Sequence, residues 1–133
     1  MLPLTSVMPK ELMPINGKPN LQYILDECID AGVREFIFII SKKKLSIKKY
    51  FFNDNFYRKI IKKKKDKRLL EEYKKIKKYQ KMIKFVYQNK PKGTGDAVLK
   101  CKKLIKDKYF LMIISPILKQ YFSLLFSWQL LIH

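Results

Sequence analysis

The sequence predicts an α/β fold over residues 1–114, because helical and strand patterns alternate along that segment. Short apolar runs at residues 35–40, 83–87 and 110–114 predict three strands. Runs that are apolar at nearly every position are typical of strands covered on both faces in a parallel sheet. Parallel strands need long crossover connections, and the segments between these runs carry helical patterns. We therefore expect a sheet flanked by helices.

The first helix is predicted over residues 20–31. Leu21, Ile24, Leu25, Cys28 and Ile29 fall at the spacing of one helix face. Pro19 suits the start of this helix and Gly32 suits its end. Residues 3–19 are predicted to form a loop, because prolines and a glycine interrupt this segment too often for a helix.

A lysine-rich helical insertion is predicted over residues 41–80. Its pattern indicates a short helix at 42–51, a turn at 51–56 and one longer helix at 57–80. The apolar stripe of the longer helix contains Ile60, Ile61, Leu69, Leu70, Tyr73 and Ile76. After the strand at 83–87, a loop at 88–95 leads into a helix predicted over 96–105. A Gly-Thr-Gly turn that opens a helix lets a ligand approach the backbone, although a plain helix entry has the same pattern.

The formal net charge of +19 is extreme for 133 residues and admits a nucleic-acid partner as an alternative. The arginines are Arg34, Arg58 and Arg68, and every other basic residue is a lysine. Proteins that read phosphates or base edges favour the planar fork of arginine. We therefore interpret the charge as a solvated surface and expect no nucleic-acid partner.

Cysteine and histidine usage leaves little material for a metal site. Cys28 and Cys101 lie far apart within apolar helical patterns, which predicts two buried thiols in a reducing compartment. His133 is the single histidine and the last residue. Residues 1–5 do not resemble a signal peptide, and the apolar segment 121–132 is shorter than the roughly 20 residues of a membrane-spanning helix. We expect a cytoplasmic protein without a membrane partner.

Two loops and an insertion carry a family pattern. The first loop contains Leu2-Pro3-Leu4-Thr5, Pro9-Lys10-Glu11, Met13-Pro14-Ile15 and Lys18-Pro19, and the second places Gln88, Pro91, Gly93, Gly95 and Ala97 at fixed spacing. These motifs resemble the sugar-nucleotide nucleotidylyltransferases. Gln22-Tyr23-Ile24 and the insertion with Leu69-Leu70-Glu71-Glu72 are similar to the bacterial UTP–glucose-1-phosphate uridylyltransferase branch. The resemblance implies an incomplete Rossmann-like nucleotidyltransferase sheet with a lysine-rich helical insertion, corresponding to the N-terminal part of such an enzyme.

The resemblance also implies a reaction and its residues. In this family a sugar 1-phosphate oxygen attacks the α-phosphate of UTP, and pyrophosphate leaves. Lys10 matches the lysine that meets the phosphates and is the candidate catalytic residue, since a compact positive charge suits that task. Gln88 matches the glutamine that reads the uracil edge, and Gly93 the glycine against which the base lies. Lys18 belongs to the same motif, with a loop anchor as the alternative role. Asp96 stands where relatives often have histidine and is not assigned to a metal.

Two further parts of the family pattern are missing from the sequence. A Gly-x-Gly-Thr-Arg loop is expected just before Met1, and an acidic motif is expected where Ser115-Pro116-Ile117-Leu118 stands. The Mg²⁺ expected for the family therefore lacks its carboxylate ligands, since no Asp or Glu lies beyond Asp107. The apolar tail at 115–133 predicts out-of-frame translation and a gene remnant.

The sequence therefore predicts a uridylyltransferase by resemblance, with UTP and glucose 1-phosphate as substrates and an inactive fragment as the form of this chain. Family members are often homo-oligomers. A basic nucleic-acid-binding protein and a nucleotide-binding module without catalysis remain the alternatives.

Overall fold

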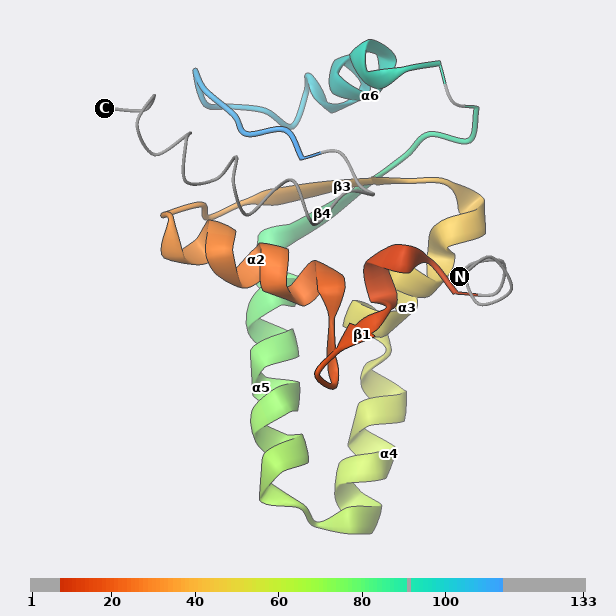
Figure 1. Cartoon of the computed structure of the whole chain (residues 1–133), viewed down its shortest axis with the longest axis vertical. Helices are drawn as coiled ribbons and strands as arrows, with labels where there is room; N and C mark the ends of the chain where they lie inside the picture. The colour runs from red at the N-terminus through yellow and green to blue at the C-terminus, as the bar shows by residue number, and fades with distance from the viewer. Residues whose placement is uncertain (1–7, 91, 114–133) are drawn as a thin grey trace.

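A computed structural model describes residues 8–90 and 92–113, and the described elements are short helices and strands (Figure 1). In chain order these are η1 (Lys10–Leu12), β1 (Pro14–Ile15), β2 (Lys18–Pro19), α2 (Asn20–Asp30), β3 (Phe36–Ile40), η2 (Lys42–Lys44), α3 (Leu45–Phe52), α4 (Asp54–Lys64), α5 (Lys67–Met82), β4 (Ile83–Tyr87) and α6 (Thr94–Cys101). The mixture of helix and parallel strand is compatible with the predicted α/β class.

The strands β3 and β4 are parallel neighbours, with Phe36 opposite Ile83 and Ile40 opposite Tyr87. The strands predicted at 35–40 and 83–87 are therefore confirmed. Helices α3, α4 and α5 form the connection between them, as a parallel pair requires. Ile39 keeps 36% of its surface exposed, so β3 is less covered than its apolar sequence predicts. The larger Rossmann-like sheet stays a prediction, because the described residues contain this one parallel pair.

The segment predicted as a loop over 3–19 contains a small antiparallel hairpin in its described part. Pro14 pairs with Pro19, and Ile15 pairs with Lys18. The turn residues Asn16 and Gly17 have φ angles of 50° and 75°. Positive φ at both central residues is the requirement of the tight hairpin turn that Asn-Gly favours. The prediction was wrong here because the prolines hid an ordinary hairpin signal.

Helix α2 begins at Asn20, as predicted, and ends one residue before the predicted boundary. Leu25 and Cys28 of its predicted inner face are buried. Gly32 follows with a φ of 97°, and the Val33 amide donates to the Cys28 carbonyl at 2.9 Å. A left-handed glycine of this kind satisfies carbonyls at the end of a helix.

The helix predicted over 57–80 is wrong as one element, because the chain reverses between α4 and α5. Lys65 adopts a left-handed conformation with φ 47°, and its amide donates to the Ile61 carbonyl at 2.9 Å. Asp66 then caps α5 by accepting a bond from the Arg68 amide at 2.8 Å. The two antiparallel helices form what we call the helical hairpin, and Figure 1 shows it projecting away from β3 and β4. The turn predicted at 51–56 is confined to Asn53, which caps α4.

The third strand, predicted over 110–114, is wrong for residues 110–113, which form neither strand nor helix. Phe110 and Met112 are exposed there, with 54% and 49% of their surfaces accessible. No strand of the described residues pairs with this apolar run to complete its backbone hydrogen bonds. The helix predicted over 96–105 begins earlier and is shorter, as α6. Residue 114 and the tail at 115–133 lie outside the described residues.

The buried core joins the sheet to the roots of the surrounding helices. It is centred on Leu25, Ile40, Ile47, Phe51, Tyr79 and Ile83. Phe51 is fully buried, and its ring meets those of Phe38 and Tyr79 edge to face at 5.8 and 6.1 Å. Edge-to-face contacts of this kind add to the free energy gained by burial. Among the described helices, none combines the length and apolarity that a membrane crossing needs.

Candidate functional site

Both strands of the parallel pair end at the same edge of the sheet, which we call the carboxyl edge. The Gln88 amide, one residue beyond β4, donates to the Ile40 carbonyl at the end of β3 at 3.0 Å. Gln88 therefore stands directly at this edge. Crevices outside the carboxyl ends of parallel strands are where open α/β sheets bind ligands.

The loop after Gln88 folds back onto that side chain. The Gln88 Nε2 atom donates to Asp96 Oδ2 at 2.8 Å and approaches the Gly93 carbonyl oxygen at 3.4 Å. Gly93 has a φ of 92°, and a Cβ atom built there would meet no heavy atom within 4 Å. Glycine is needed at this position for the backbone angle, and the open space beside it leaves room for a ligand. The structure thus brings Gln88 and Gly93 together with the first turn of α6.

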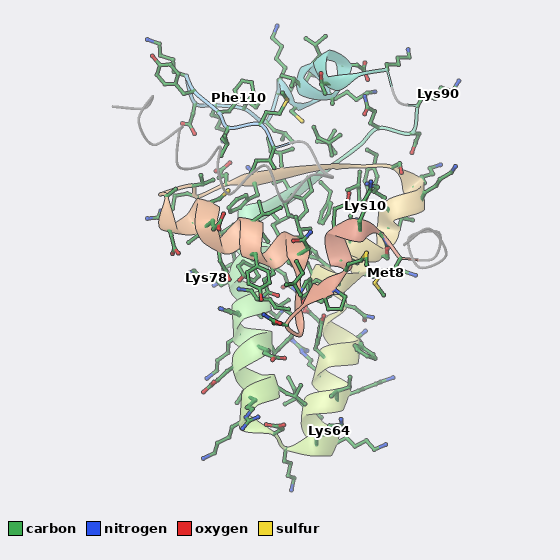
Figure 2. All side chains as sticks on the ribbon, in the orientation of Figure 1. Met8, Lys10, Lys64, Lys78, Lys90 and Phe110 are labelled. Atoms are coloured by element: carbon green, nitrogen blue, oxygen red, sulfur yellow. The ribbon has the colours of Figure 1, made fainter. Side chains whose placement is uncertain are left out.

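The short helix η1 is held at the carboxyl edge by its two residues after Lys10. Glu11 accepts a bond from the Lys44 ammonium at 2.5 Å, and Lys44 lies in η2 just after β3. Leu12 packs against the buried core. With these neighbours turned inward, Lys10 is exposed, and no carboxylate of the described residues pairs with its ammonium. Figure 2 labels Lys10 and Lys90 on the side of the molecule where β3 and β4 end.

Further lysines surround this edge. Those in η2, α3 and the loop after β4 are Lys42, Lys43, Lys44, Lys48, Lys90 and Lys92. The Lys48 ammonium donates to the Tyr87 hydroxyl at 2.9 Å and lies 5.5 Å from the centre of that ring. A surface with this excess of positive charge raises the local concentration of anions.

Lys18 is engaged elsewhere. Its ammonium forms an ion pair with Asp26 of α2 and lies 4.5 Å above the Tyr23 ring. Burial raises the pKa of Asp26, but hydrogen bonds from Lys18 and the Tyr79 hydroxyl outweigh burial, and the net pKa is lowered. These contacts fasten the β1–β2 hairpin to α2 and α5, which favours the role of loop anchor for Lys18.

The described residues do not form a magnesium site. No three histidine, cysteine, aspartate or glutamate side chains gather closely enough among residues 8–90 and 92–113 to hold a metal ion. At the carboxyl edge, Glu11 is bonded to Lys44, and Asp96 is bonded to Gln88. A hard cation needs several oxygen ligands, and these two carboxylates serve other partners. Cys28 and Cys101 are free and buried, as predicted, and burial raises the pKa of each thiol.

Two contacts of the site were not predicted from the sequence. The Asp96–Gln88 bond spans eight residues across a loop, and the Lys44–Glu11 bond spans 33. A signal for the first existed, since an acidic residue in the first turn of a helix is common and lies beside the chain that leads into it. The second contact depends on tertiary packing, and no local pattern marks it.

Comparison with known proteins agrees with the family pattern in the two loops. The chain is 34% identical over 114 residues to UTP–glucose-1-phosphate uridylyltransferase of Bacillus subtilis. This match covers 86% of the chain and 39% of that protein. It is 32% identical over 123 residues to the enzyme of the same name from Haemophilus influenzae, and 30% over 118 residues to that of Salmonella typhimurium. These matches cover 92% and 89% of the chain, and 42% and 40% of the two relatives. No protein-family model matches the chain.

The resemblance predicted from the motifs is therefore confirmed. The chain is similar to UTP–glucose-1-phosphate uridylyltransferases over most of its own length, and it spans about two fifths of the length of these relatives.

Proposed function

We propose that the carboxyl edge is the nucleotide half of a uridylyltransferase site, in which UTP binds with glucose 1-phosphate as the second substrate of the complete reaction. The observation that supports this proposal is that three segments lie near the carboxyl ends of the parallel pair. Helix η1, which carries Lys10, is tied through Glu11 to Lys44 just after β3, Gln88 follows β4 directly, and the turn with Gly93 folds back onto Gln88. The similarity to relatives that bear this enzyme name supports the same assignment.

Lys10 is proposed to contact the phosphates of UTP. Its exposure and its lack of a described carboxylate partner leave the ammonium available to an anion. The Glu11–Lys44 bond and the packing of Leu12 hold the backbone of η1, from which Lys10 extends, before the ligand arrives. A positioned charge stabilises the negative charge that builds on the phosphates during transfer.

Gln88 and Gly93 are proposed to hold the uracil base. An amide side chain can hydrogen-bond to a base edge, and Gly93 leaves open space beside the backbone. Lys18 is proposed to act as an anchor of the β1–β2 hairpin, because its ammonium is already paired with Asp26.

The chain is proposed to bind UTP without turning it over. The two described carboxylates of the edge are engaged with Lys44 and Gln88, so they do not supply the oxygen ligands that Mg²⁺ needs. The Rossmann-like sheet, the insertion assignment of the helical hairpin and assembly with further copies belong to the same proposal by resemblance.

Calorimetric titration of the full chain with UTP tests this function. We expect saturable binding that survives addition of duplex DNA, and no pyrophosphate release with Mg²⁺ and glucose 1-phosphate. Failure to bind UTP, together with a steeply salt-dependent and sequence-independent affinity for DNA, would favour a basic nucleic-acid-binding protein instead. Magnesium-dependent pyrophosphate release would show that the chain is a complete catalyst.

A further inference from the structure

The hydrogen bond between Asp96 and Gln88 fixes which way the Gln88 amide faces. We propose that Asp96 is a positioning residue that turns the Gln88 carbonyl oxygen toward the base and so makes the site prefer uracil to cytosine. This inference rests on the proposed function, and it names the specificity of the same site.

The chemistry of the two side chains determines the orientation. A carboxylate only accepts hydrogen bonds, and the Gln88 amide carries its two donors on Nε2 and its acceptor on Oε1. Nε2 lies 2.8 Å from Asp96 Oδ2, with the Gly93 carbonyl oxygen at 3.4 Å on the same atom. A flipped amide would bring Oε1 against the carboxylate oxygen and the carbonyl oxygen. The donors of Gln88 are therefore used within the chain, and its acceptor faces away from Asp96.

Asp96 is itself held in place. It lies in the first turn of α6, where a negative charge interacts favourably with the helix N-terminus. Lys100, one turn further along the same helix, approaches its carboxylate at 4.0 Å. Gln88 is fixed from the other side by the bond between its backbone amide and the Ile40 carbonyl at 3.0 Å. The acceptor at the edge is thus supported by both α6 and β3.

An oriented acceptor distinguishes the two pyrimidines. Uracil carries an N–H donor at N3 between two carbonyl groups, whereas cytosine presents a lone pair at N3. The Gln88 oxygen accepts a hydrogen bond from the uracil N3–H group and repels the lone pair on cytosine N3. A site that pairs its acceptor with one donor binds an analogue less tightly when that analogue leaves the acceptor unpaired.

The test compares UTP and CTP binding to the full chain by calorimetry, for the wild type and for Asp96→Asn. Asparagine offers either a donor or an acceptor, so it lets the Gln88 amide face both ways. We expect the wild type to bind UTP at least about tenfold more tightly than CTP, and the ratio in Asp96→Asn to fall below about threefold. The matched control is Asp30→Asn at the exposed end of α2, where the ratio is expected to stay unchanged.

A second variant separates positioning from general damage. Asp96→Glu keeps the carboxylate acceptor and is expected to retain most of the preference for UTP. The NMR resonances of the Gln88 side-chain amide report on its hydrogen bond to Asp96. Their chemical shifts are expected to differ between the wild type and Asp96→Asn. An unchanged UTP to CTP ratio in a folded Asp96→Asn variant overturns the inference and leaves the proposed function standing. A wild type that binds neither nucleotide overturns both.

Discussion

The carboxyl edge and the helical hairpin are both rich in lysine and both contain exposed as well as paired lysines, but the carboxyl edge lies where the parallel strands end and the hairpin does not. In the hairpin, Lys77 bonds to Asp54 at 2.5 Å, and Lys75 lies 3.8 Å from Asp26. At the carboxyl edge, the carboxylates of Glu11 and Asp96 turn toward Lys44 and Gln88, and the ammonium of Lys10 is left exposed. Positive charge alone therefore does not locate a site. The ends of the strands and the direction of the acidic partners locate it.

The two regions are also separated in space. Figure 2 labels Lys64 at the far end of the hairpin, away from both Lys10 and Lys90. The hairpin joins the rest of the molecule at the end of α5 nearest the core, where the Tyr79 hydroxyl donates a hydrogen bond to Asp26 of α2. Substitutions in the hairpin should therefore affect stability where they disturb the core around Tyr79, and should leave ligand binding at the carboxyl edge unaltered.

The largest effect is expected for Phe51→Ala, which removes a fully buried ring of α3 from the core. Loss of a buried phenylalanine and the cavity it leaves cost about 3–5 kcal/mol in the free energy of unfolding. The matched control is Phe56→Ala on the hairpin, where the ring is 54% exposed and the loss should be far smaller. Urea denaturation followed by circular dichroism measures both. Equal losses would contradict the position of the core.

Asp26→Ala is expected to cost about 1–3 kcal/mol, the usual range for removing a charged hydrogen-bond partner. Hydrogen bonds from Lys18 and Tyr79 outweigh burial and hold the Asp26 pKa below its ordinary value of 3.8. A lowered pKa means that the stabilisation is present above pH 3.8 and is lost as the pH falls through the lower, folded-state value.

Denaturation of wild type, Asp26→Ala and Tyr79→Phe at a series of acidic pH values checks this. The wild type should lose stability below pH 3.8 more steeply than Asp26→Ala, with Tyr79→Phe in between. Identical dependence of stability on acidic pH for all three proteins would show that the Asp26 carboxylate does not stabilise the fold.

Lys10→Ala is expected to weaken UTP binding about tenfold, which corresponds to roughly 1.4 kcal/mol for one charge-assisted contact. Lys63→Ala is the matched control, since Lys63 is an exposed lysine of α4. Its effect on the dissociation constant should stay within about twofold. Comparable losses for both variants would indicate that UTP responds to net charge and not to the carboxyl edge.

The smallest effect is expected for Lys77→Met, which removes the ion pair with Asp54 inside the hairpin. Both side chains are about one third exposed, so solvent screens their attraction. The melting temperature should change by no more than about 2 °C, and UTP affinity should not change. A loss of UTP binding in this variant would remove the distinction between the two regions.

The sequence predicted the parts of the fold that depend on local pattern. The apolar runs at β3 and β4 and the helical repeat of α2 were identified because burial imposes those periods. The sequence does not predict the break between α4 and α5, because Lys65 and Asp66 also fit the polar face of one continuous helix. The reversal of the chain there depends on tertiary packing. The Asn16-Gly17 turn was a readable signal that the neighbouring prolines obscured.

Only part of the candidate site could be predicted from the sequence. Family motifs named Lys10, Lys18, Gln88 and Gly93, but the bonds that hold them involve residues distant in the chain. Lys44 fixes the position of Glu11, and Asp26 binds Lys18. Such pairings follow from three-dimensional packing, so no spacing rule could have supplied them.

UTP is proposed to bind at the carboxyl edge and not at the helical hairpin. Two-dimensional amide NMR spectra of the ¹⁵N-labelled chain, recorded during titration with UTP, test it most directly. We expect the resonances of Lys10, Gln88 and Gly93 to shift in a saturable way, while those of α4 and α5 stay in place. Shifts confined to the hairpin lysines, or no shifts at saturating UTP, would contradict the account.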